Sequence, residues 1–105
     1  MRVAVAALIG LTLAGCGEGP AADDAAARGQ TVYLAQCTAC HATNPAQAGP
    51  VGPPIKGSSP ELVEAKVLHG TYPPGYTPKR TSTLMPPMPQ LASSVPDLAA
   101  FLGSR

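Results

Sequence analysis

The sequence predicts a small all-α domain of about three helices, joined by long loops rich in proline and glycine. Helix start and stop signals mark three segments, at residues 25–37, 59–70 and 94–103. Most of the 13 prolines lie between these segments. The chain has 105 residues, no tryptophan and one phenylalanine, so it is one domain at most and can bury little large apolar surface. We therefore expect a large apolar cofactor to complete its core.

One pentapeptide, Cys37-Thr38-Ala39-Cys40-His41, carries the chemistry. C-x-x-C-H is the attachment signature of c-type haem. Residues three and four apart share a face of a helical turn, so both thiols can form thioethers with one porphyrin while His41 binds its iron. A zinc half-site would need two more ligands at compact spacing, and a redox dithiol would follow a buried strand. The pattern predicts one covalent haem c.

Residues 1–15 have the features of a secretory signal peptide: a basic Arg2, an apolar run and a small-residue end. Cys16 follows directly and resembles the lipobox cysteine of bacterial lipoproteins, which is lipidated and becomes the first mature residue. The alternative is an ordinary secretory signal with an incidental cysteine. No run reaches the roughly 20 apolar residues of a membrane span. The resemblance implies a periplasmic chain anchored through its acyl chains, and Gly17 favours the outer membrane because inner-membrane lipoproteins often carry aspartate there.

Residues 16–24 are then the lipidated cysteine and a flexible tether, and residues 25–105 form the haem domain. The first helix is predicted over residues 25–37, with Asp23 or Asp24 as its N-cap.

The segment from Gly29 to Cys37 (GQTVYLAQC) resembles the first helix of class I cytochromes c. That helix reads Gly, two residues, an aliphatic, an aromatic, three residues and then C-x-x-C-H. In that family the glycine lets the first helix cross closely against an aromatic residue of the last helix, here Phe101. The resemblance covers about residues 25–102 and implies a monohaem, all-α cytochrome c-like fold.

Gly52-Pro53-Pro54-Ile55 is similar to the Gly-Pro-x-Leu segment of that family. There the proline carbonyl accepts a hydrogen bond from the axial histidine ring, which orients the ring and raises its basicity. The resemblance assigns this role to Pro53, with Pro50 as the alternate. Alternatively, Pro50 and Pro53 are both simple turn prolines.

A second helix is predicted to start at Ser59 as N-cap, with Pro60 at its first position, and to end at Gly70. His69 lies in the last turn, where it suits the helix dipole. The alternative for His69 is a second axial ligand. Residues 71–84 are interpreted as a solvated loop with two charges. Alternatively, Tyr72 and Tyr76 line a haem edge, and Lys79-Arg80 faces a propionate or a docking partner.

Met85-Pro86-Pro87-Met88-Pro89 presents two thioethers on an extended, proline-rich backbone. In class I cytochromes c a methionine opens a similar segment and is the second iron ligand, six or seven residues before a leucine. The resemblance assigns this role to Met85, with Met88 as the alternate. The last helix is predicted to begin at Ser94-Val95-Pro96-Asp97 and to end at Gly103.

The resemblance implies single-electron transfer between redox proteins, without a small-molecule substrate. The sequence has no acid/base pair, nucleophile set or phosphate loop of an enzyme, and its formal charge of +1 offers no basic stripe for nucleic acid. Two alternatives remain: an electron-delivering subunit of a periplasmic oxidoreductase, and a gas-binding or sensor haem with an open sixth site.

Overall fold

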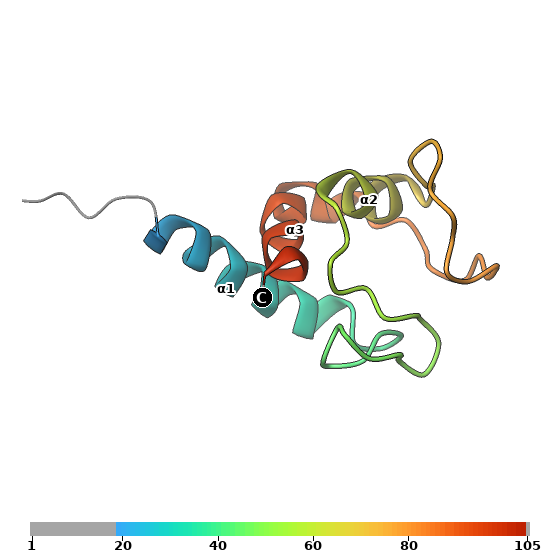
Figure 1. Ribbon diagram of the computed structural model, residues 1–105, viewed down its shortest axis with the longest axis horizontal. Helices are drawn as coiled ribbons and strands as arrows, with labels where there is room; N and C mark the ends of the chain where they lie inside the picture. The colour runs from blue at the N-terminus through green and yellow to red at the C-terminus, as the bar shows by residue number, and fades with distance from the viewer. Residues whose placement is uncertain (1–18, 105) are drawn as a thin grey trace, which may run out of the picture.

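The computed structural model describes residues 19–104, which form three α-helices joined by loops (Figure 1). The elements in chain order are α1 (Gly19–Gln36), α2 (Pro60–Glu64), the π-helical turn η1 (Ala65–His69), the 3-10 helix η2 (Pro89–Ser94) and α3 (Val95–Gly103). Residues 19–104 contain no strand, and the predicted all-α class is confirmed. No helix in this part of the chain combines the length and apolar character of a membrane span. The predicted signal peptide and Cys16 lie outside the described residues.

Helix α1 begins earlier than the sequence analysis predicts. The prediction of Asp23 or Asp24 as the N-cap is wrong, because residues 19–24 are helical and both aspartates lie inside α1. The run 21–27 is mostly alanine, which has the highest helix propensity. Pro20 stands in the first turn, where its missing N–H is not needed. The domain boundary between residues 24 and 25 stays a prediction.

Helices α1 and α3 cross in close contact at Gly29 (Figure 1). A Cβ atom added to Gly29 would overlap the carbonyl oxygen of Asp97 and come within 2.9 Å of the Phe101 Cβ. Next to the crossing, the rings of Tyr33 and Phe101 pack with centroids 5.3 Å apart. The predicted contact between the glycine turn and Phe101 is therefore present, and only a residue without a side chain fits there.

A two-point ion pair spans the same crossing. The Arg28 guanidinium donates to both Asp97 carboxylate oxygens, through Nε at 3.0 Å and Nη2 at 3.1 Å. The hydrogen bonds from Arg28 to Asp97, and then the charge of that carboxylate, raise the pKa of Arg28. Both side chains reach solvent, so we expect the pair to add little to stability.

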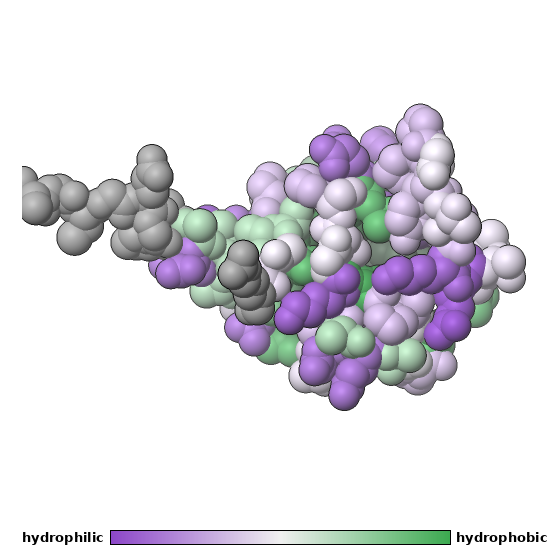
Figure 2. Space-filling view, viewed as in Figure 1, coloured by the Kyte–Doolittle hydropathy of each residue, from purple (hydrophilic) through white to green (hydrophobic). Residues whose placement is uncertain are grey.

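The hydrophobic core is small and lies where α1, α2, η1 and α3 meet. Its buried members are Tyr33, Val63, Val67, Val95, Leu98, Ala99 and Leu102. The Tyr33 side chain is fully buried, and its hydroxyl donates to the carbonyl oxygen of Ala42 at 2.5 Å. Burial also raises the pKa of Tyr33. In the view of Figure 2 the surface is mostly hydrophilic, and hydrophobic residues show between the polar side chains.

The continuous helical run of α2 and η1 begins and ends at the predicted residues. The Ser59 hydroxyl accepts from the Leu62 N–H at 3.2 Å, and Gly70 ends the run in the left-handed conformation, with φ of +65°. The π-helical turn η1 is not predicted by the sequence. Its Val67 carbonyl, which has no partner within the helix end, accepts from the Met88 N–H at 2.6 Å. This bond attaches the methionine segment to the helix.

Replacing Gly29 with alanine should destabilise the protein, because the new methyl group has no room against the α3 backbone. Overpacking costs about 1–3 kcal/mol, and the gain in helix propensity offsets about 1 kcal/mol of that cost. Gly103→Ala is the matched control, because nothing lies within 4 Å of its added Cβ. Denaturant unfolding measures both variants. A Gly29→Ala midpoint equal to that of the wild type would contradict the close crossing.

Candidate functional site

A large open cavity lies beside the hydrophobic core, bounded by the end of α1, by α2, η1 and α3, and by two loops. It holds about 1020 Å³ of empty space, its open mouth included. Its walls are mostly apolar, with Val51, Ile55, Leu62, Val63, Leu84 and Leu98 among the lining residues. The four helical elements thus surround a space that their own side chains do not fill.

The pentapeptide 37–41 turns directly after α1 and faces this cavity. The N–H of Cys37 donates to Tyr33 O at 2.9 Å, and the N–H of His41 donates to Cys37 O at 2.9 Å, so the helical winding continues past Gln36. Cys37, Cys40 and His41 all line the cavity, and both cysteines are free thiols. Burial raises the pKa of the Cys37 thiol. Two sulfur atoms and one imidazole therefore face the same space.

The ring of His41 is buried, with 8% of the residue exposed, and is held from two sides. Its Nδ1 lies 3.1 Å from the carbonyl oxygen of Pro53. Because a carbonyl can only accept, Nδ1 carries the proton in this contact, and in the corresponding neutral tautomer the lone pair of Nε2 would be the one to bind a metal. Gly52 lies against the ring so closely that an added Cβ would overlap Nδ1 and Cε1. The alternate Pro50 is exposed and is not among the cavity-lining residues.

The loop that carries Pro53 folds back on the pentapeptide. The Cys40 carbonyl accepts from the Gly52 N–H at 2.7 Å and from the Val51 N–H at 3.2 Å. A Cβ on Gly49 would overlap the backbone of Cys40 and His41. Gly49 and Gly52 thus allow the close approach of the two segments. The sequence signal for this contact is the repeated Gly-Pro dipeptide.

The two candidate methionines have different surroundings. Met85 lines the cavity together with the two cysteines and His41, whereas Met88 is not one of its lining residues. Both side chains are partly buried against the core, and the Met88 backbone is bonded to Val67. The fold therefore brings Met85 into the space that His41 faces. His69 is exposed in the last turn of η1 and does not line the cavity.

The loop 71–84 is mostly exposed, as the interpretation as a solvated loop predicts, and six of its residues also line the open cavity. Tyr72 and Tyr76 stack with ring centroids 5.4 Å apart, and both line the cavity, as do Lys79 and Arg80. The Lys66 ammonium lies 4.4 Å from the Tyr72 ring centroid, a cation–π contact that ties the loop to η1. The two tyrosines lie in a proline-rich loop without a periodic sequence pattern, so these contacts could not be predicted from their spacing.

Positive charge collects at the cavity. Lys66, Lys79 and Arg80 line it, and no Asp or Glu of residues 19–104 does. A porphyrin of the c type carries two propionate carboxylates, so basic residues near an apolar pocket suit it. The residues present fit a c-type haem: two thiols and a buried imidazole with a free Nε2 lie on one wall, a thioether lines the same space, and apolar side chains complete it.

Substituting Gly52 by alanine should displace the His41 ring, because the added methyl overlaps it. Loss of an orienting contact to a metal ligand lowers metal affinity about 10–100-fold. Because the thioethers would hold the porphyrin independently of this ligand, we expect a changed haem spectrum from weaker binding of His41 to iron, rather than a proportional loss of haem, in a host that attaches c-type haem. Gly103→Ala again serves as the control. A Gly52→Ala variant with the wild-type haem spectrum would contradict the ring's tight placement.

One protein-family model matches the chain. It is described as cytochrome c oxidase, cbb3-type, subunit III, and the match covers residues 24–102. Comparison with curated proteins found no match, and comparison with solved structures found none. The matched range includes the C-x-x-C-H turn, both loops that line the cavity, and α3. The chain therefore belongs to the family of cbb3-type cytochrome c oxidase subunit III and is a c-type cytochrome domain that transfers electrons through haem.

Proposed function

We propose that this chain is a membrane-tethered monohaem electron carrier of the periplasm, with His41 and Met85 as the two axial ligands. The observation that carries the proposal is that Cys37, Cys40, His41 and Met85 line one cavity. When bound, haem supplies an iron that alternates between the ferrous and ferric states. In this proposal the task of the chain is to hold this cofactor and its ligands.

Each residue has a separate part in that task. Cys37 and Cys40 hold the porphyrin covalently, and His41 offers Nε2 while Pro53 keeps its Nδ1 proton in place. The Met85 thioether is a neutral, soft ligand that favours the ferrous state and raises the potential. The apolar walls and the loop 71–84 limit access of water. Redox partner proteins then exchange electrons through the edge of the cofactor.

A second candidate function is electron delivery within a larger oxidoreductase complex. The observation that favours it is the description of the matching family as an oxidase subunit. Purification under mild detergent separates the two functions. A free carrier elutes alone, whereas a subunit elutes with a larger partner in constant proportion.

The ligand assignment predicts different spectra for two methionine variants. Met85→Leu should abolish the far-red methionine–iron band of the oxidised protein, whereas Met88→Leu should retain it, since Met88 does not line the cavity. Reduced Met85→Leu should also bind carbon monoxide promptly, and the wild type should not. Prompt binding by the wild type would favour a gas-binding haem with an open sixth site. Loss of the band in Met88→Leu alone would assign the ligand to Met88.

The tether is proposed from the sequence around Cys16, which precedes the described residues. Cells fed labelled palmitate should incorporate label into the wild type and not into Cys16→Ser. The variant should retain haem, because the haem-binding residues lie elsewhere, and should leave the membrane fraction. Equal labelling of the two proteins, or a membrane-bound Cys16→Ser, would contradict lipid anchoring at this cysteine.

A further inference from the structure

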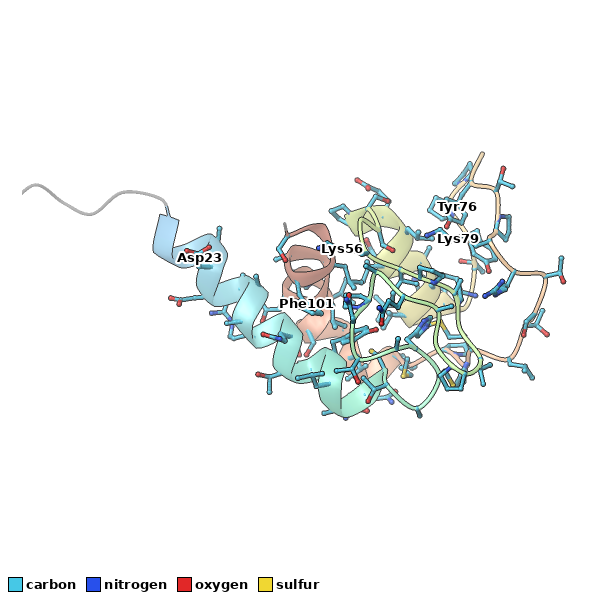
Figure 3. The ribbon with its side chains drawn as sticks, turned by 60° about the horizontal axis from the view of Figure 1, so that its bottom comes forward. Asp23, Lys56, Tyr76, Lys79 and Phe101 are labelled. Carbon is cyan, nitrogen blue, oxygen red and sulfur yellow. The ribbon has the colours of Figure 1, made fainter. Side chains whose placement is uncertain are left out.

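The open cavity is bounded by two loops that meet through a single described hydrogen bond. Residues 42–57 form the loop on the His41 side, and residues 71–84 form the loop that leads into Met85. Lys79 Nζ donates to the carbonyl oxygen of Pro54 at 2.7 Å. Within residues 19–104, no other hydrogen bond joins these two loops. Figure 3 shows Tyr76 and Lys79 on the second loop, both of which line the cavity.

The acceptor of this bond is a rigid part of the chain. Pro54 follows Pro53, whose carbonyl accepts a hydrogen bond from His41 Nδ1. Two successive prolines have fixed φ angles and no backbone N–H, so this segment is pre-set in an extended form. Both residues are half-buried. The carbonyls of Pro53 and Pro54 thus anchor His41 and Lys79 to the same stretch of backbone.

The donor lies in a stretch with little other support. Every residue from Thr77 to Leu84 is exposed. The only other hydrogen bond described in this stretch is local, from the Leu84 N–H to the Ser82 hydroxyl. Met85 follows directly, and the next described anchor is the bond from the Met88 N–H to Val67. Met85 therefore lies between two attachment points, Lys79 six residues before it and Met88 three residues after it.

We infer that Lys79 is a positioning residue that holds the loop 71–84 closed over the cavity and keeps Met85 directed at the haem iron. It acts through the backbone of Pro54 and links the Met85 side of the cavity to the His41 side. The inference rests on the proposed ligation by Met85. Lys56 is the matched comparison, because it is an exposed lysine of the loop 42–57 that does not line this cavity and whose side chain makes no described hydrogen bond.

Competition by imidazole for the ferric holoprotein tests this role. Imidazole competes with Met85 for the iron, and it should displace a methionine more easily when the loop is less firmly attached. Lys79→Ala should therefore raise the apparent imidazole affinity about three- to tenfold, as the loss of one hydrogen bond predicts. Lys79→Arg should return the affinity to within about twofold of the wild type, because it retains a charged donor. Lys56→Ala should also stay within about twofold. The denaturation midpoint of Lys79→Ala should remain near that of the wild type, since Lys79 is exposed.

Two results would overturn the inference. One is an equal imidazole affinity for Lys79→Ala and the wild type, or an equal rise in Lys56→Ala. The other is a changed midpoint potential in Lys79→Ala with unchanged imidazole affinity, which would assign Lys79 to a propionate charge. Met85→Leu separates the two proposals: it should bind imidazole more tightly than every Lys79 variant. If Met85→Leu matches the wild type, the ligand assignment fails and this inference fails with it.

Discussion

The placement of the His41 ring is the constraint on which the rest of the site depends. The ring is buried between the Pro53 carbonyl, 3.1 Å from Nδ1, and the backbone of Gly52. A neutral imidazole with its proton fixed on Nδ1 has one remaining lone pair, on Nε2. The loop from Ala42 to Gly57 is long and proline-rich because it must leave the C-x-x-C-H turn and return to it. Its return is secured by the two hydrogen bonds to Cys40 O.

The two sides of the cavity differ in how many contacts hold them in place. The His41 side rests on a buried ring and several backbone bonds, whereas the Met85 side is a mostly exposed loop with few attachments. Regions with few buried contacts open at low free-energy cost. An electron carrier benefits when its coordination changes little between oxidation states. Under the proposed ligation by Met85, the contacts of Lys79 and Met88 on either side of it are therefore the ones that would keep the coordination unchanged.

Much of the site could be predicted from local sequence because its chemistry is local. C-x-x-C-H spans one helical turn, so the common facing of Cys37, Cys40 and His41 follows from helical geometry. Ser59 and Gly70 bound a helical run through bonds that they make within a few residues. Gly29 and Phe101 were paired through a family resemblance, and the close crossing of α1 and α3 agrees with it. The start of α1 differs from the predicted one, because the helix propensity of the alanines outweighs the preference of two aspartates for a cap position.

The sequence by itself determined the helical class, the haem-attachment turn and the pair of methionine candidates, because each follows from periodicity, fixed spacing or side-chain chemistry. Only the tertiary structure decided which residues share the cavity: Met85 and not Met88, Pro53 and not Pro50, and the tyrosines and Lys79 of the loop 71–84. These contacts join residues up to dozens of positions apart through irregular loops. A loop's path depends on where its ends are attached, and no local pattern encodes that path.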